Sequence, residues 1–537
     1  MFKPCLFIIG LTMAMASGCG KGEEQAKKAE SKAQPEAKSK KEPAPASKPP
    51  PPAKAAKTPK IKSVAEIKKT PEQEEEDRFL ESLRPKHEGK PSTLKIELEK
   101  LRAKGEPVTL KELDAWHKAV PPEKNAALAF QRTTNSLPKN SSDLRAAAFT
   151  QNMDPMLIKE PAYRAKAQAF LAAHQAHINQ LFIIYQRYPG NQPARFRVDW
   201  THGFATKLPH ISEVKRAARL LMLRSQFFAT HQRAPVAQGQ NALNFSDQQQ
   251  AVSSILVLLR LCHLLDGDPA LISALVQFAS CNYGRHALET VLNMRILTDA
   301  QLVLLQRAFA NYNCGQRFSN AIIGERGITL GIEQIFRSGT PPEQARIDPD
   351  GPYRLIPNPI RLILKSRPEP MRDREMTTFI AYYNEFLSGL RKGYPDFTDF
   401  ASDHGAFAKK WNKWTDLIGN RRHKIRYILT NICAQSITKL KDRIHLAVLT
   451  QQFAITALAI ERYRLANRGQ IPGTLRKLMP NYLLAHPFDP FTGKPLIYHD
   501  APNGSYKLLS AKALEDKPTP FAKNEYTFSV DPANRLK

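Results

Sequence analysis

The chain has 537 residues, of which 42% are hydrophobic, and a formal net charge of +29 at pH 7. This length allows two to four domains of about 150 residues each, and the hydrophobic content is sufficient for a sizeable core. The six cysteines form no CxxC pair and no Cys/His cluster with zinc-like spacing, so the sequence supports neither a thioredoxin-type motif nor a structural zinc site. The basic balance suits anionic partners, unless the surplus lysines only solvate the surface.

The N-terminus has the three parts of a secretion signal. Lys3 precedes an apolar run from Leu6 to Ala16, and small residues follow. The run is shorter than the roughly 20 apolar residues of a bilayer span. Ser17-Gly18-Cys19 resembles the cleavage site of bacterial lipoproteins, which implies a signal peptide over residues 1–18 and lipid on the Cys19 thiol. An ordinary signal peptide with a chance cysteine is the alternative.

Residues 19–70 are almost entirely Lys, Ala, Glu, Pro and Ser, including the run Pro49–Pro52. Such a composition cannot bury apolar surface, so we predict a disordered or locally polyproline-like tether. It would extend on the order of 100 Å at about 3.1 Å per residue. Gly20 after the cysteine, by resemblance to Gram-negative sorting, implies the outer membrane of the cell envelope, facing the periplasm.

Residues 71–436 are predicted to form an α-helical body. Pro71–Leu83 is an acidic helix, and Thr109 opens a capping box with Glu112. Ser246 and Thr298 are predicted N-caps, the second again within a capping box. Asp268-Pro269 is predicted to start a helix, with Asp at the N-cap and Pro at N1. Apolar spacings of three and four recur without a fixed repeat, which favours a mostly α, array- or solenoid-like fold.

The cysteines that would remain in the mature body are Cys262, Cys281, Cys314 and Cys433, all in apolar helical surroundings. Such cysteines are usually small buried hydrophobes with free thiols. The alternative is a disulfide between Cys281 and Cys314, which an antiparallel hairpin of their two helices would place at similar heights. An oxidising compartment would permit that bond.

Residues 437–537 differ from the body. A long helix is predicted from Ile437 to Asn467, where glycines and prolines break it. Three short strands are predicted after it: Leu496–His499, Tyr506–Leu509 and Tyr526–Val530. The sequence therefore predicts a small α+β unit at the C-terminus of the helical body.

This tail resembles the periplasmic head of type II secretion major pseudopilins. The resemblance rests on the order of residues in 459–467, Gly469–Pro472 and 486–498: a helix with a tyrosine, Pro after the turn, Asp-Pro-aromatic, Gly, Pro and Tyr. It implies a long helix packed on a small antiparallel sheet. Two features depart from that family: the lipoprotein-like start, and Ser510–Ala513 where pseudopilins place a calcium-binding loop.

A broader resemblance covers most of residues 105–510. Uncharacterised bacterial envelope proteins are similar in joining a helical body to this tail. The matching pieces are Leu113–Trp116, Val120-Pro121, Asn125–Ala127, Asp268–Ser273, Thr298–Leu302 and Gly324–Arg326. This resemblance implies an architecture and no activity.

Three groups of residues are candidate sites. His174 and His177 could face one side of a helix, but no further metal ligand is near, so solvent-facing or cap-bonding roles are favoured. Gly324-Glu325-Arg326 could hold a structural ion pair between packed helices or bind an anion. The densest basic-aromatic patch is a candidate contact for lipid or an anionic polymer. Its residues are Lys409, Lys410, Trp411, Lys413, Trp414, Arg421 and Arg422. Buried tryptophans with solvated lysines are the alternative.

The motifs GxSxG, HExxH, Walker A and GxGxxG are missing from the sequence. We therefore predict no catalytic residue, metal or cofactor, and a lipid-anchored envelope scaffold or interaction protein. Its expected partners are the membrane, through the N-terminal lipid, and other proteins; nucleic acid is not expected outside the cytoplasm. The alternatives are an accessory component of a secretion or pilus-like system and an envelope-polymer hydrolase.

Overall fold

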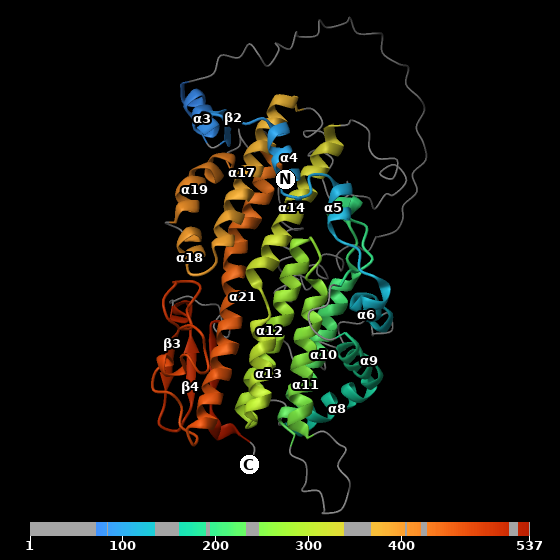
Figure 1. Cartoon of the computed structure of the whole chain (residues 1–537), viewed down its shortest axis with the longest axis vertical. Helices are drawn as coiled ribbons and strands as arrows, with labels where there is room; N and C mark the ends of the chain where they lie inside the picture. The colour runs from blue at the N-terminus through green and yellow to red at the C-terminus, as the bar shows by residue number, and fades with distance from the viewer. Residues whose placement is uncertain are drawn as a thin grey trace, which may run out of the picture.

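The computed structural model describes residues 71–82, 84–134, 160–188, 194–231, 246–337, 367–402, 405–419, 427–514 and 525–535. These residues are mostly helical and end in a small three-stranded antiparallel sheet, as the sequence predicts (Figure 1). The predicted signal peptide, Cys19 and the predicted tether over 19–70 lie outside the described residues.

Helices follow one another from residue 71 to residue 466. They are α3 (Pro71–Ser82), α4 (Leu94–Ala103), α5 (Leu110–Trp116), α6 (Ala126–Thr134), α8 (Pro161–Ala173), α9 (Gln175–Arg187), α10 (Pro209–Ala229), α11 (Asp247–Cys262), α12 (Leu271–Met294), α13 (Asp299–Ala310), α14 (Cys314–Arg337), α17 (Glu369–Lys392), α18 (Asp396–Ala401), α19 (Ala406–Gly419) and α21 (Ile428–Ala466). A short hairpin of β1 (Lys86–His87) and β2 (Lys90–Pro91) interrupts them and was not predicted.

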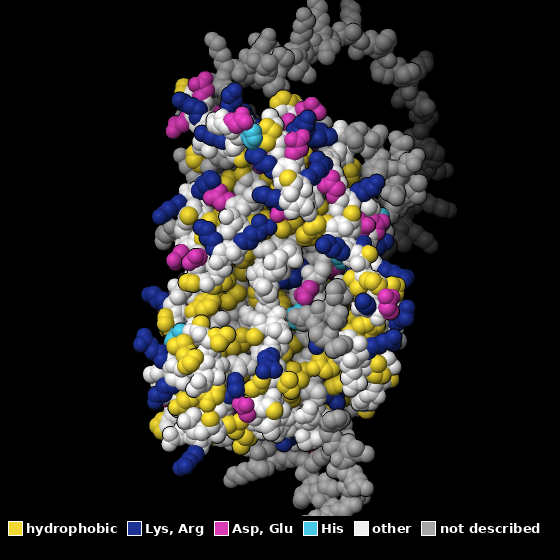
Figure 2. All heavy atoms as spheres, viewed as in Figure 1, with side chains coloured by type: hydrophobic (Ala, Val, Ile, Leu, Met, Phe, Trp, Pro, Cys, Tyr) yellow, Lys and Arg dark blue, Asp and Glu magenta, His cyan; other side chains and the backbone are white. Residues whose placement is uncertain are grey.

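One hydrophobic core extends through the helices and into the sheet, from Leu94 to Val530. Nearly every residue of α12 is buried, because other helices and β5 cover it on most sides. It packs against α10, α11, α14 and α21, and α13 lies along α21 (Figure 1). Lys and Arg side chains are scattered over the face shown in Figure 2 and do not gather in one patch there.

Three of the predicted N-caps are formed, but the capping box at Thr109 is altered. Thr298 and Gln301 form the full capping box of α13, and the Ser246 hydroxyl accepts the N–H of Gln249 at the start of α11. Thr109 also caps its helix, by accepting the N–H of Glu112 at 3.0 Å. The Glu112 carboxylate, however, accepts the backbone N–H of Val108 at 2.8 Å. The second half of that predicted box is therefore displaced by one residue.

The prediction that Asp268 caps a helix is wrong. Helix α12 begins at Leu271, and its N-cap is Ala270. The Asp268 carboxylate accepts hydrogen bonds from side chains of other elements and does not bind the first N–H groups of α12. A tertiary contact has thus replaced the local one that the sequence predicts.

The tail follows the predicted order of elements. Helix α21 begins at Ile428, earlier than the predicted Ile437, and crosses the predicted limit between body and tail. The strands are β3 (Ile497–Asp500), β4 (Tyr506–Leu509) and β5 (Thr527–Val530), paired antiparallel in the order β3-β4-β5. The part of α21 from Lys439 to Ala466 is long and apolar enough to cross a membrane, but 83% of its most apolar window is buried inside the protein.

Side chains of α12 bind the outer edge of β5. The Glu289 carboxylate accepts the N–H of Ser529 at 2.8 Å, and the Asn293 amide donates to the carbonyl of Ser529 at 2.8 Å. The Asn293 side-chain oxygen also accepts the N–H of Asp531 at 2.8 Å. These bonds satisfy the backbone groups of an edge strand and fix the sheet to the helical body.

The four described cysteines, Cys262, Cys281, Cys314 and Cys433, are buried and free. The Cys281–Cys314 disulfide that the sequence allows is not formed. Burial raises the pKa of the Cys314 and Cys433 thiols, the second to about 12. Thiols in this state are poor nucleophiles, as expected of buried structural cysteines.

Candidate functional site

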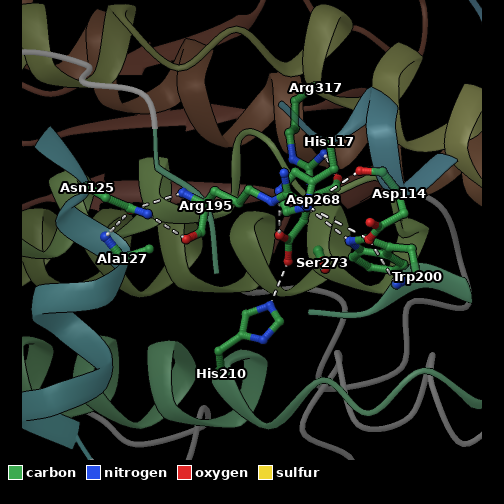
Figure 3. Close-up of polar contacts among 10 residues, drawn as sticks. All are labelled: Asp114, His117, Asn125, Ala127, Arg195, Trp200, His210, Asp268, Ser273 and Arg317. Carbon is green, nitrogen blue, oxygen red and sulfur yellow. Dashed lines mark hydrogen bonds and ion pairs between the residues drawn. The ribbon is translucent and has the colours of Figure 1, made fainter. Parts of the chain in front are cut away.

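The most elaborate buried polar cluster centres on Asp268, whose exposed fraction is 1% (Figure 3). One carboxylate oxygen, Oδ2, contacts the Nε2 atom of His210 at 2.6 Å and accepts the Ser273 hydroxyl at 3.0 Å. The other oxygen, Oδ1, lies 3.7 Å from the Nε2 atom of His117. Asp268 therefore joins side chains from three separate segments.

Each group reaches the cluster from a different element. His117 ends α5, His210 lies in the first turn of α10, and Ser273 lies in the first turn of α12. Gly324 brings α14 against the segment that carries Asp268. A Cβ atom at Gly324 would lie 2.0 Å from the carbonyl oxygen of Pro269, so this approach needs a residue without a side chain.

A tryptophan fixes the protonation of His117. The indole N–H of Trp200 donates to the Nδ1 atom of His117 at 3.0 Å, so Nδ1 carries no proton. The proton of the neutral ring then lies on Nε2, facing Asp268. Trp200 is 1% exposed, and its own backbone N–H donates to Asp114 at 3.3 Å.

Burial and charge set the ionisation of the cluster. Burial lowers the pKa of His117 to about 4, which keeps this ring neutral at pH 7. Burial alone would raise the pKa of Asp268, but the hydrogen bond from His210 and the nearby Arg317 guanidinium lower that pKa overall. Asp268 is therefore an ionised carboxylate beside a neutral His117.

Arg317 supplies the nearest permanent positive charge. Its guanidinium donates to the backbone carbonyl of Asp268 at 2.7 Å and to the Gln277 side chain at 2.6 Å, and the residue is 3% exposed. A buried carboxylate is tolerated when it is hydrogen-bonded and a cation compensates its charge. The cluster meets both conditions, which ties α5, α10, α12 and α14 together.

The geometry does not suit nucleophilic catalysis. In a serine hydrolase the serine bonds to the histidine, and the aspartate bonds to the far side of that histidine. Here the Ser273 hydroxyl and His210 both bind the same oxygen of Asp268, so no histidine is placed to take the serine proton. All of these side chains are also sealed from solvent. What the arrangement does chemically is hold packed elements in place.

Within the described part of the chain, no group of three His, Cys, Asp or Glu side chains could hold a metal ion. A small cleft opens between α6, α9 and α11, lined mainly by Leu, Ile, Val and Ala. Arg260, Tyr185, Tyr188 and His263 are its polar lining residues, and none of its lining residues is a carboxylate. The cleft thus lacks the paired carboxylates that a polymer hydrolase of the glycosidase type uses.

The prediction that Trp411 belongs to an exposed basic-aromatic patch is wrong. This side chain is 1% exposed, and its indole N–H donates to Glu385 at 2.9 Å, so Trp411 packs in the core and cannot contact a lipid or polymer. Lys409 and Lys410 are exposed, and Lys410 pairs with Glu385 at 2.6 Å. The side chains of Lys413 and Trp414, and the whole of Arg421 and Arg422, lie outside the described residues.

The other candidate site residues, His174 and Arg326, have structural contacts. His174 lies at the junction of α8 and α9, where its Nδ1 atom contacts the carbonyl oxygen of Phe170 at 2.8 Å, and its ring stacks on that phenyl ring. Arg326 on α14 is fully buried and pairs with Glu106, so it forms a structural ion pair, with a residue of the segment between α4 and α5 in place of a second helix. Burial raises the pKa of the neighbouring Glu325 to about 7.

Sequence reasoning missed His117, Trp200 and His210 altogether, because they are far apart in the chain and belong to no motif. For Asp268 the sequence predicts only a local role, as an N-cap. One sequence signal points to this group. Asp268 lies between two largely apolar helices, α11 and α12, and an acidic residue buried there needs polar partners. Comparisons with protein-family models, curated proteins and solved structures match nothing.

Proposed function

We propose that this chain is a lipid-anchored scaffold or interaction protein of the bacterial cell envelope, on the periplasmic side of the outer membrane. The observation that carries the proposal is Ser17-Gly18-Cys19 after a short apolar run. The composition of residues 19–70 supports it, because a long tether between an anchor and a folded body suits a protein that holds partners away from a membrane.

The folded body is consistent with that role. The Asp268 cluster is buried, and its hydrogen bonds join the Asp268 segment to α10 and α12, so the cluster makes the helical body more rigid. Helices α10, α11 and α12 all pack against one another, and further helices add to both sides of this group. We propose an array- or solenoid-like architecture for residues 71–436.

Membrane fractionation with acyl labelling tests the anchor. Cys19→Ser should move the protein out of the detergent-rich membrane fraction into the soluble or uncleaved pool and abolish labelling by a fatty acid. Cys5→Ser is the matched control, because that cysteine lies inside the predicted signal peptide and should leave fractionation unchanged. Unchanged labelling of the Cys19→Ser protein would show that the anchor is wrong.

A second candidate is an accessory component of a secretion or pilus-like machine. A specific feature of the tail supports it: the long helix α21 contacts the sheet through the rings of Phe453 and Phe528, and a loop with the buried Asp489 precedes the first strand. The Asp489 carboxylate accepts the Ser510 hydroxyl at 3.0 Å and the N–H of Ala511 at 2.9 Å. This pseudopilin-like unit would serve as the contact to such a machine.

Crosslinking separates the two candidates. The full chain is crosslinked in cells, extracted with detergent and purified, and its partners are identified by mass spectrometry. Crosslinks from Lys494 or Lys507 on the tail to secretion or pilus components would favour the machine. Crosslinks only from lysines of the helical body to other envelope proteins would favour the scaffold.

A further inference from the structure

The small cleft between α6, α9 and α11 holds a positive charge that no acidic side chain of the described residues balances. Arg260 lies in the last turn of α11, and Tyr185 and Tyr188 reach the cleft from the end of α9. Helix α9 packs against both α6 and α11, so the cleft lies where the three helices meet (Figure 1). A buried charge without a partner is costly, which makes this position unusual.

The Arg260 guanidinium is only partly satisfied. Its Nη1 atom is buried and has no hydrogen-bond partner among the described residues. The group interacts with Tyr185, whose ring centroid lies 5.4 Å away. Burial lowers the pKa of Arg260, because the interaction with Tyr185 offsets only part of the lost solvation. Buried polar groups left unbonded by the protein commonly bind water or an ion.

The fold balances a buried arginine elsewhere but not here. Arg326 pairs with Glu106 inside the body. Asp266 is the acidic residue closest to Arg260 in the sequence, but its carboxylate pairs with His263 at 2.9 Å. Within the described part of the chain, Tyr185 is the side chain whose interaction favours the charged form of Arg260. The charge of Arg260 is therefore available to a bound anion.

The walls of the cleft and its single cation indicate the kind of anion. The walls are mostly buried aliphatic side chains: Leu181, Ile184, Val257, Leu261 and Leu264. A guanidinium matches a carboxylate, which can accept two parallel N–H bonds from it. A phosphate would call for further cations, and neither a lysine nor a second arginine lines the cleft. Because the cleft is small, only a short hydrocarbon chain fits against its walls.

We propose that this cleft binds a short-chain aliphatic carboxylate. The carboxylate pairs with the Arg260 guanidinium, and the hydrocarbon chain lies against Ile184 and Leu261. A water molecule is a poorer occupant, because it would satisfy Nη1 and leave the charge uncompensated. The site belongs to the helical body, so the inference goes beyond the proposed scaffold role and does not depend on the anchor at Cys19.

Ligand binding to the purified full chain tests the site. Hexanoate should raise the melting temperature progressively with its concentration, because it binds only the folded chain. Hexanamide has the same hydrocarbon chain without the charge, and inorganic phosphate has charge without the chain, so both should shift the melting temperature much less. Hydrogen exchange should slow in α9 and α11 around the cleft when hexanoate is added, and it should stay unchanged in α17.

Substitution of Arg260 separates a ligand site from a structural role. Arg260→Gln should weaken hexanoate binding roughly ten-fold or more, because the charge-assisted pair is lost. Without ligand its melting temperature should equal or exceed that of the natural chain, since the variant no longer buries an uncompensated cation. Arg260→Lys keeps the charge and should retain part of the affinity. Arg307→Gln is the matched control, because this arginine is exposed on α13 and does not line the cleft; it should leave binding unchanged.

Three results would overturn the inference. The first is that neither the melting temperature nor hydrogen exchange responds to hexanoate. The second is an equal response to hexanamide or to phosphate, which would make the cleft a purely apolar or a purely ionic site. The third is an Arg260→Gln chain that melts at a lower temperature without ligand and binds hexanoate as before, which would make Arg260 a structural residue. None of these results bears on the anchor, which fatty-acid labelling of Cys19 tests separately.

Discussion

Replacing Asp268 by alanine should destabilise the protein strongly. The change removes the acceptor of His210 at 2.6 Å and of the Ser273 hydroxyl at 3.0 Å, inside a cluster that water does not reach. It also leaves the Arg317 guanidinium, 3% exposed, without its nearest compensating charge in this cluster. Removing one partner from a buried charged network typically costs about 3–5 kcal/mol. Total stabilities are commonly about 5–15 kcal/mol, so the effect should be large.

Urea unfolding followed by far-ultraviolet circular dichroism measures the change, with the melting temperature as a second readout. Asp299→Ala, at the start of α13, is the control outside the cluster. Its carboxylate is 57% exposed and pairs with Arg462 at 2.8 Å, so its loss should cost about 1 kcal/mol or less. Asp268→Asn keeps one acceptor oxygen but removes the charge, and it should fall between the two alanine variants.

The reasoning would be refuted if Asp268→Ala and Asp299→Ala lost the same stability to within about 1 kcal/mol, because removing the buried acceptor should cost more than that. That result would mean that the cluster relaxes or admits water when the carboxylate is removed. A stability unchanged in Asp268→Asn would refute the further claim that the charge, beyond the shape of the side chain, balances Arg317.

Three further predictions concern Gly324, Asn293 and His117. Gly324→Ala should cost about 1–3 kcal/mol through its clash with Pro269, whereas Gly315→Ala, with its nearest neighbour atom at 3.8 Å, should be neutral or slightly stabilising in the same melt. Asn293→Ala should speed amide hydrogen exchange in β5 and leave the centre of α12 protected. The pKa of His117 is lowered from 6.5 to about 4, so as the pH falls the unfolded chain binds this proton before the folded chain does. The free energy of unfolding should therefore decrease between pH 6.5 and pH 4. In His117→Gln that decrease should be smaller by about 3 kcal/mol than in the natural protein.

Features that depend on neighbouring residues could be predicted from the sequence. The caps at Ser246 and Thr298 form because the residues three positions on supply the bonding groups. The tail strands are found close to their predicted limits, since alternating side chains and turn residues mark them locally. The bounds of α21 were less accurate: its start at Ile428 depends on Glu375, whose carboxylate accepts the N–H of Leu429 from a different helix.

Features that depend on distant residues could not be predicted. Asp268 has the local pattern of an N-cap, but His210 lies 58 residues before it and offers a shorter bond inside the core. Trp411 has the composition of a surface patch, yet its ring packs against Tyr382 and its N–H meets Glu385. In both cases a tertiary partner outweighs the local tendency, and a single sequence carries no record of which partner that is.

The bonds between α12 and β5 also constrain the order in which the protein can be completed. Glu289 and Ser529 are 240 residues apart, so the helix is synthesised long before the strand that covers its side chains. Until then the tail sheet lacks its third strand and the apolar surface of α21 is incompletely covered. Such late, long-range closure slows folding and exposes surfaces that chaperones and proteases recognise. A chain that ends before residue 525 would therefore leave the Glu289 and Asn293 side chains of α12 without their strand partners and Phe453 of α21 without the ring of Phe528.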